Sequence, residues 1–193
     1  MKKLHKWGIL FLSLSIVVVI WQITIGNGVT VRAWFAHSLL HTAWVRAKAS
    51  GQPVKPWPWA NTWPIARISA PHLKLEQIVL SHAGDGMSVF ALGHSRNSVL
   101  PGEMGNSVLN IYHSDTFVGF LKKLRKGDEL VLESLGSGRW HYQVSGIYIV
   151  DKTNTRWIAP GLKRRLTIIG CYSCNIEEVS RYVVTAVAIE TMA

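Results

Sequence analysis

Hydrophobic and polar positions divide the chain into three stretches of different periodicity. Residues 7–26 are almost all apolar, and no charged residue occurs between Lys6 and Arg32. Residues 29–49 carry apolar side chains at near-helical spacing and precede a Ser-Gly pair, which predicts an amphipathic helix. From residue 65 onward, short apolar runs alternate with turn-forming residues, a pattern typical of β-structure.

The β-like stretch contains one short helical pattern, Thr116–Lys123, which follows two candidate N-cap residues, Ser114 and Asp115. Strands and helices do not alternate, which argues against a doubly wound parallel sheet. Many short strands in about 130 residues predict a mainly β domain, a mostly antiparallel barrel. The predicted strands are 65–69, 73–79, 107–112, 129–133, 140–150, 165–170 and 181–190.

A proline- and tryptophan-rich segment, Lys55–Pro64, separates the predicted helix from the first strand. Alternating prolines exclude a regular helix or a central strand there. We therefore expect an extended segment whose rings pack on the domain, in preference to lying at a membrane surface.

The first apolar stretch is long enough to cross a membrane, which takes about 20 helical residues. The apolar part of a cleaved signal peptide is shorter, roughly 7–15 residues, so we predict an uncleaved anchor, with cleavage near Ala33 or Ala36 as the alternative. Lys2, Lys3 and Lys6 precede the stretch, and this positive charge predicts a cytoplasmic N-terminus with residues after 26 on the outer side.

The net charge of +10 raises the question of nucleic-acid binding. The basic clusters are small, at residues 122–126 and 163–165, and no recognition motif accompanies them. An exported domain seldom meets nucleic acid. We therefore predict no nucleic-acid partner and a basic surface near anionic lipid head groups.

The strongest chemical signal lies in the last two predicted strands. Leu166-Thr-Ile-Ile-Gly-Cys171 ends in a cysteine, and Arg181 opens the next apolar run. Solvent can reach a cysteine at a strand end, and a nearby guanidinium favours its thiolate or a developing oxyanion. This pair predicts nucleophilic catalysis, and His113 is the candidate acid and base.

An ordered set of motifs resembles the sortase family, membrane-anchored cysteine transpeptidases of the bacterial envelope, and specifically its marine proteobacterial, class D/E-like type. His113-Ser-Asp-Thr-Phe117 stands where the family has His-Arg-Asp-Thr-Phe. Leu166–Cys171 stands where it has Thr-Leu-x-Thr-Cys, and Arg181-Tyr-Val-Val is similar to the arginine strand. The similarity covers residues 55–190 and includes Lys55–Pro64, Gly93-His94, Leu100–Ser107, Phe120–Leu124 and Lys126–Glu129.

The resemblance implies a closed β-barrel with short helices, preceded by one transmembrane helix and a juxtamembrane helix. The implied enzyme cleaves a C-terminal Leu-Pro-x-Thr-Gly-like sorting signal and transfers the protein to an amine. The sequence has no acidic cluster that suggests a calcium site, so we predict no metal and no cofactor. Its implied place is the bacterial inner membrane, with the catalytic domain on the periplasmic side. The predicted parts are a cytoplasmic N-terminus (1–6), an anchor (7–26), a juxtamembrane helix and linker (27–54) and a catalytic domain (55–193).

Three departures from the family pattern put the level of activity in question. Tyr112 replaces the glycine before the histidine, and Ser114 replaces the arginine after it. Gly170 replaces the threonine before the nucleophile, so only a backbone N–H remains there to support the oxyanion. Removing one such donor costs on the order of 10²–10³ in rate.

Three further residues are secondary candidates. His94 follows a glycine, as the family histidine does, but lacks the motif that follows His113. Asp115 suits a helix cap better than catalysis. Cys174 forms a C-x-x-C motif with Cys171, which suits a disulfide, a redox pair or half of a zinc site.

Two other functions therefore remain open. One is a weakly active or inactive sortase-like module that binds a C-terminal peptide. The other is an envelope thiol–disulfide protein that uses Cys171 and Cys174.

Overall fold

The structure is a computed structural model that describes residues 7, 14–16, 28–82, 91–111, 115–136, 138–151, 153–174 and 179–189. The chain divides into two compact units, residues 1–38 and 39–193. Within the described ranges, no helix has both the length and the apolar character that a membrane crossing requires. The predicted anchor at 7–26 lies largely outside these ranges and stays a prediction.

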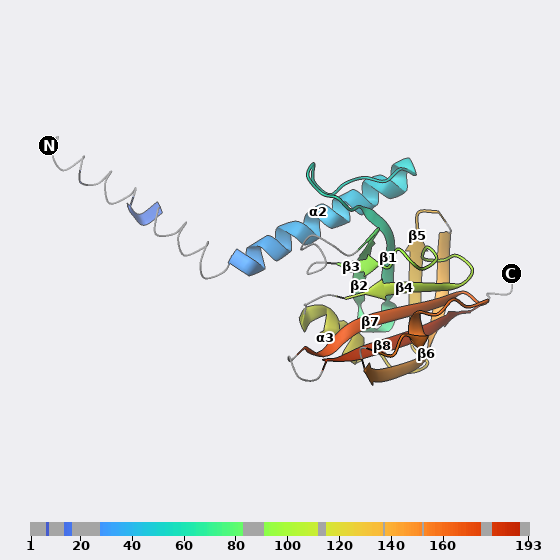
Figure 1. The fold of residues 1–193 in the computed structure, drawn as a ribbon. Coiled ribbons are helices and arrows are strands. Elements are labelled where there is room, and N and C mark those ends of the chain that lie inside the picture. Colours follow the sequence, from blue (N-terminus) through green and yellow to red (C-terminus); the bar gives the residue numbers. More distant parts are fainter. Residues whose placement is uncertain are drawn as a thin grey trace. The chain divides into compact units, whose positions relative to one another are not determined.

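The second unit is a closed β-barrel (Figure 1). Its strands, as far as the chain is described, follow the order β1-β2-β3-β4-β7-β8-β6-β5 around the barrel. Two neighbouring pairs, β2/β3 and β4/β7, are parallel and the others are antiparallel, which confirms the predicted mostly antiparallel barrel. The strands are β1 (Pro64–Ala70), β2 (Leu75–Leu80), β3 (Leu92–His94), β4 (Asn106–Asn110), β5 (Glu129–Ser134), β6 (Gly138–Asp151), β7 (Arg165–Cys174) and β8 (Val179–Ala188).

Two details of the strand prediction were wrong. The second strand starts at Leu75 because Pro71–Leu73 forms a 3-10 turn, η1, which ends at Lys74 with φ of 53°. Proline suits the first position of such a turn because its φ is already fixed near the helical value. Strand β3 was missed, since its three residues are too few to show a period.

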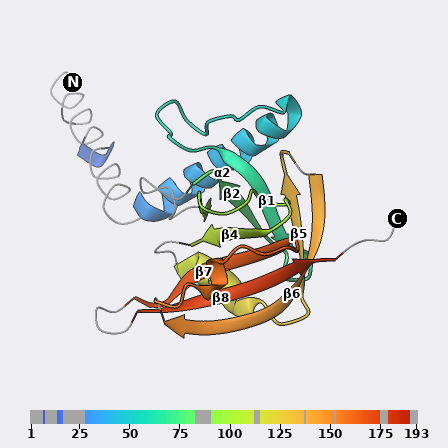
Figure 2. The same ribbon diagram turned by 45° about the vertical axis from the view of Figure 1, so that its right-hand side comes forward.

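The barrel interior is the main hydrophobic core. Strand β1 shows the alternation that a barrel requires, with Ala66, Ile68 and Ala70 all buried. Helix α3 (Asp115–Lys123) adds Phe120 to this core and contacts β7. Figure 1 shows α3 close to β7 and β8, and in Figure 2 the same helix, drawn in yellow, lies partly behind these two strands. The predicted helix over 116–123 is confirmed.

The helix α2 (Gly28–Ser50) confirms the helix predicted over 29–49. In the second unit, its residues Leu40 and Trp44 pack on the outer face of β2, against Ile78 and Leu80. From the proline-rich segment, Trp57 joins this cluster, as expected, whereas Trp59 is 79% exposed.

A buried carboxylate ties the end of α2 to the barrel. Glu133 of β5 accepts hydrogen bonds from Lys48 of α2 (3.1 Å), Arg67 of β1 (2.7 Å) and Arg139 of β6. Burial alone raises the pKa of Glu133, but these three hydrogen bonds outweigh it and lower the pKa to about 2. One carboxylate therefore links four elements.

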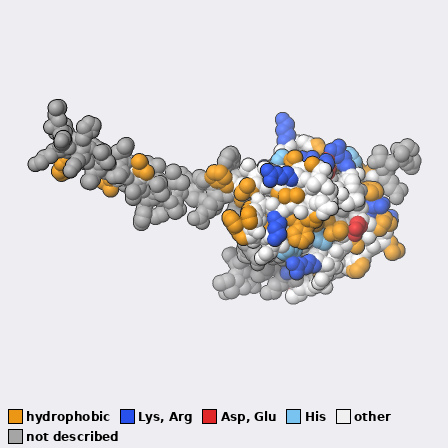
Figure 3. Space-filling model, turned by 90° about the horizontal axis from the view of Figure 1, so that it is seen from above, with side chains coloured by type: hydrophobic (Ala, Val, Ile, Leu, Met, Phe, Trp, Pro, Cys, Tyr) orange, Lys and Arg blue, Asp and Glu red, His pale blue; other side chains and the backbone are white. Residues whose placement is uncertain are grey.

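Basic side chains are spread over the surface of the barrel unit. On the face shown in Figure 3, Lys and Arg side chains occur over several elements and acidic side chains are few. This distribution is consistent with the net charge of +10.

Candidate active site

The pairing of β7 with β8 places the predicted nucleophile opposite the predicted arginine. Cys171 is the register partner of Arg181, and Gly170 is the partner of Tyr182. Directly opposed residues of an antiparallel pair project from the same face with Cβ atoms about 4.5–5.5 Å apart. The register shifts between Cys171 and Ser173, and such irregularities are common beside active sites.

Cys171 and Arg181 line one cavity, which we call the Cys171 pocket. Its volume is about 240 Å³. Cys171 is half-buried and Arg181 is exposed, so a substrate can reach both from solvent. Val108 and Ile169 supply apolar surface and belong to a small buried cluster with Val183. The lining residues are Ser95, Val108, Asn110, Ile158, Ile169, Gly170, Cys171 and Arg181.

Gly170 lies in this pocket, directly before Cys171. A glycine brings no hydroxyl, so at this position only the backbone N–H is available as a donor. Among the described residues, no group of three or more His, Cys, Asp or Glu side chains is arranged to hold a metal ion.

His113 lies outside the described residues, so its predicted role stays a prediction. The described chain on its N-terminal side passes close to the pocket, because the Ile111 N–H donates to the carbonyl oxygen of Ile169 at 2.8 Å. Helix α3 then begins at Asp115, whose side chain is also outside the description.

The secondary candidate His94 is not among the residues that line the Cys171 pocket. Its ring is buried, and Nε2 lies 2.9 Å from the carbonyl oxygen of Val99 and 3.1 Å from Oγ of Ser98. The Ser98 hydroxyl also accepts a hydrogen bond from the Val108 N–H. These contacts hold the turn between β3 and β4, which favours a structural role for His94.

Cys171 is disulfide-bonded in the structure. The chain contains one other cysteine, Cys174, whose side chain lies outside the described part. A disulfide sulfur cannot attack a carbonyl group, so Cys171 must be reduced before it can act as a nucleophile.

Five residues of the pocket were not among the predicted site residues: Ser95, Val108, Asn110, Ile158 and Ile169. Asn110 is the last residue of β4 and pairs with both Gly93 and Ile169, so its position at a strand end was an available signal. Ile158 belongs to the connection between β6 and β7, where no periodic pattern predicts contact with the barrel.

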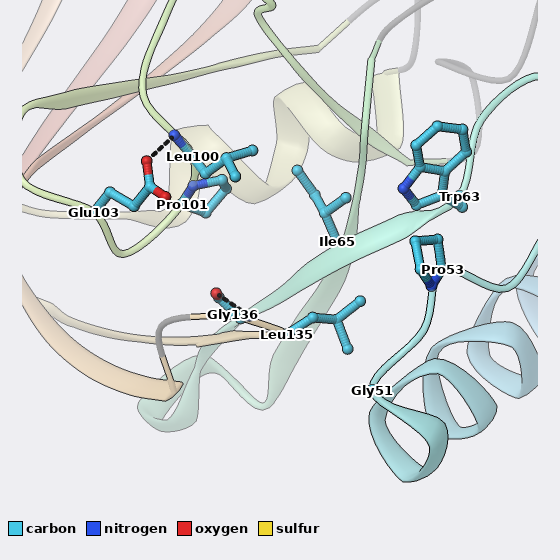
Figure 4. Close-up of a pocket in the computed structure, with 10 residues that line it drawn as sticks. Gly51, Pro53, Trp63, Ile65, Leu100, Pro101, Glu103, Leu135 and Gly136 are labelled. Atoms are coloured by element: carbon cyan, nitrogen blue, oxygen red, sulfur yellow. Dashed lines mark hydrogen bonds between the residues drawn. The ribbon is translucent and has the colours of Figure 1, made fainter.

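A second cavity of about 240 Å³ opens elsewhere on the barrel unit, and we call it the apolar cavity. In Figure 4, the side chains of Trp63, Ile65 and Leu135 lie around it, with Pro53 beside Trp63. Glu103 accepts a hydrogen bond from the backbone N–H of Leu100 (3.1 Å). The described residues that line this cavity include neither a cysteine nor an arginine.

Comparison with known proteins gives a consistent result. A family model described as Sortase domain matches residues 68–189. A sortase E variant from Streptomyces avermitilis is 28% identical, with a TM-score of 0.55, 65% of this chain covered and 87% of that chain. A sortase D transpeptidase from Clostridium perfringens is 23% identical (TM-score 0.57, 65% and 79% covered), and sortase A from Corynebacterium diphtheriae is 21% identical (TM-score 0.59, 80% and 84%). No curated protein sequence matches significantly.

Proposed function

Since this chain belongs to the sortase family of cysteine transpeptidases, we propose that Cys171, His113 and Arg181 form its catalytic site. The observation that carries the proposal is the shared position of Cys171 and Arg181, opposed across β7 and β8 and lining one pocket. Reaction begins when the Cys171 thiolate attacks the scissile carbonyl of a peptide and forms a tetrahedral oxyanion.

Arg181 stabilises this oxyanion, because its guanidinium projects from the same sheet face as the attacking sulfur. His113 donates a proton to the leaving amine as the C–N bond breaks, which leaves a thioacyl-enzyme. An acceptor amine then attacks the thioester and loses a proton to His113, and Cys171 departs as the thiolate. Gly170 offers a backbone N–H alone to the oxyanion, so we expect a slower reaction than a threonine there would support.

We propose a donor protein with a C-terminal Leu-Pro-x-Thr-Gly-like sorting signal. The apolar walls that Val108, Ile158 and Ile169 give the pocket support an apolar residue close to the scissile bond. The proposal extends to a class D/E-like type, an inner-membrane anchor at 7–26, a linker at 27–54 and a periplasmic catalytic domain at 55–193. The long apolar stretch and the preceding lysines support this location.

The test is acyl-enzyme formation by the full chain in detergent, with a sorting-signal peptide and a phosphine reductant. Intact mass should show the peptide acyl group on wild type, and glycine amide should convert the adduct to a transpeptidation product. Peptide binding without an adduct would favour the inactive peptide-binding module.

One observation supports the alternative function of a thiol–disulfide protein: Cys171 is disulfide-bonded in the structure. The transpeptidase proposal predicts that Cys174→Ser keeps acyl transfer and removes its need for reductant, since Cys171 then has no internal disulfide partner. A thiol–disulfide protein would instead lose function with Cys174→Ser as fully as with Cys171→Ser. Reduction of a model disulfide and acyl transfer are measured on the same samples.

A further inference from the structure

One wall of the Cys171 pocket comes from a turn outside the barrel. The 3-10 turn η3 (Arg156–Ile158) lies in the connection between β6 and β7. Ile158 is 46% exposed and lines the pocket together with Cys171 and Arg181. The position of this turn therefore sets the position of the Ile158 side chain relative to the Cys171 sulfur.

A buried amide holds the turn from beneath. Asn106, the first residue of β4, is 3% exposed, and its Nδ2 donates to the carbonyl oxygens of Trp157 (2.9 Å) and Ala159 (3.1 Å). These two carbonyls belong to the residues on either side of Ile158. Both N–H groups of the amide are thereby used to fix the backbone around Ile158.

The orientation of the amide is fixed by a second buried side chain. Thr167 of β7 is 0% exposed, and its Oγ1 donates to Oδ1 of Asn106 at 2.7 Å. This hydrogen bond fixes which end of the Asn106 amide is the oxygen, so the NH₂ group faces the 156–159 segment. Asn106 and Thr167 are both buried and hydrogen-bonded to each other. Removing one of them would leave a buried polar group without a partner, which costs stability, so the orientation of the amide is well defined.

The turn has two further attachments. The Trp157 ring packs on the cluster of Val108, Ile169 and Val183 and lies 4.2 Å from the Tyr148 ring. Arg165 donates from Nη2 to the Ala159 carbonyl oxygen at 2.9 Å. These contacts keep the turn near the barrel, but the amide of Asn106 alone among the described hydrogen bonds contacts the backbone on both sides of Ile158.

We propose that Asn106 is a positioning residue of the active site, which holds the 156–159 turn so that Ile158 forms a wall of the Cys171 pocket and retains an apolar side chain of the acyl donor. Asn106 acts through Ile158 and touches no substrate. The inference rests on the proposed transpeptidase function for its substrate, but the position of the turn is testable without any substrate.

The decisive variant is Asn106→Asp. It keeps the size of the side chain and the oxygen that accepts from Thr167, but it replaces the NH₂ donor with a second oxygen that faces two carbonyls. With a sorting-signal peptide, KM should rise about tenfold, as for loss of an apolar contact, and kcat should stay within about twofold. Ile158→Ala should show the same split, and the double variant should be no worse than either single variant.

The matched control is Asn154→Asp, the same substitution in the same connection. The described side-chain hydrogen bond of Asn154 uses its amide oxygen, which accepts from the Arg156 N–H at 3.4 Å and which aspartate retains. KM for this variant should remain that of wild type. An unchanged KM in Asn106→Asp, or fully additive effects in the double variant, would overturn the proposal.

Two measurements separate this proposal from the proposed function. Hydrogen–deuterium exchange should speed up over residues 156–159 in Asn106→Asp and stay as in wild type over β7. Alkylation of reduced Cys171 by a bulky maleimide, relative to iodoacetamide, should also rise, with adducts mapped to Cys171 by peptide mass. If the wild-type protein forms no acyl-enzyme, the proposed function is wrong. If Asn106→Asp has the same hydrogen–deuterium exchange rates and the same alkylation ratio as wild type, the positioning role is wrong.

Thr167→Val provides a second route if Asn106→Asp does not fold. This isosteric change removes only the hydroxyl that orients the amide. Thr167→Val should raise both the hydrogen–deuterium exchange rate over residues 156–159 and the alkylation ratio, by a smaller factor than Asn106→Asp. A folded Thr167→Val protein with wild-type values of both would also contradict the proposal.

Discussion

Two cavities of equal volume, about 240 Å³ each, open on the barrel unit and differ in what they can do. The Cys171 pocket lies at the ends of paired strands and contains a sulfur and a guanidinium on opposed residues. The apolar cavity is lined mostly by loops and turns, with proline, leucine and tryptophan side chains. Size alone therefore does not distinguish a site from a packing gap, whereas reactive groups fixed by a hydrogen-bonded ladder do.

The two regions also differ in how their walls are held. Backbone ladders between β4, β7 and β8 position Gly170, Cys171 and Arg181. Near the apolar cavity, the end of β5 is paired with β1 and β6, and the ion-pair network of Glu133 adds side-chain links between these strands and α2. Substitutions in the first region should change the reaction, and substitutions in the second should change stability.

The largest effect is expected for Cys171→Ala, which removes the nucleophile. Acyl-enzyme formation should fall by at least about 10⁴-fold, as when the nucleophile of a catalytic unit is lost. Intact mass spectrometry after incubation with a sorting-signal peptide measures it, with Cys174→Ala as the cysteine control that keeps activity under reductant. Equal adduct levels in wild type and Cys171→Ala would place the nucleophile elsewhere.

Arg181→Ala should have the next largest effect. Loss of one oxyanion donor reduces kcat by about 10²–10³-fold, and Arg181→Lys should recover only part of this, because an ammonium group lacks the planar fork of a guanidinium. Stopped assays of peptide cleavage give kcat, with Arg46→Ala on α2 as an arginine control at wild-type rate. A wild-type kcat in Arg181→Ala would remove Arg181 from the mechanism.

Glu133→Gln tests the region of the apolar cavity through stability. At neutral pH we expect a loss of roughly 1–3 kcal/mol, because three charge-assisted hydrogen bonds weaken. The pKa of Glu133 is about 2 in the folded protein and 4.5 in its ordinary state, so this stabilisation is fully present above about pH 4.5 and is lost as pH falls toward 2.

The melting temperatures of wild type and Glu133→Gln should therefore converge as pH falls through this window, and acyl transfer at neutral pH should be alike in the two proteins. A gap in melting temperature that stays constant from pH 7 to pH 2 would contradict the role given to the carboxylate.

The smallest effect is expected for Leu135→Ala in the apolar cavity. Leu135 is partly buried against α2 and β2, so its truncation should cost about 1–2 kcal/mol of stability. The rate of acyl transfer should remain within twofold of wild type. Leu162→Ala, a substitution at a leucine that is 93% exposed, is the matched control and should leave both quantities unchanged. A tenfold loss of activity in Leu135→Ala would make the apolar cavity part of the active site.

Local patterns in the sequence were sufficient for most of the fold. The alternation in residues 65–69 and the long apolar runs near 140–150 and 181–190 correspond to β1, β6 and β8. Closure of the barrel was implied by the family resemblance. The order of the strands was not predicted, since no local pattern specifies that β4 pairs in parallel with β7.

The sequence predicted only those residues of the candidate site that lie close to the end or the start of an apolar run. Cys171 and Arg181 belong to adjacent strands, so their opposition could be expected from two neighbouring runs. Asn106 contacts the carbonyl of Trp157 across 51 positions of sequence, and a single polar residue at the start of an apolar run gives no sign of such a contact. Long-range hydrogen bonds of this kind appear only when the fold is known.

Closure of the barrel has a consequence for how many copies can stand close together. In the described barrel, each strand has a hydrogen-bonded neighbour on both sides. An open sheet would present a row of unpaired backbone groups to any adjacent copy and invite strand-by-strand aggregation. At high local concentration, copies of this domain should therefore not aggregate by pairing sheet edges. The net positive charge adds electrostatic repulsion between copies.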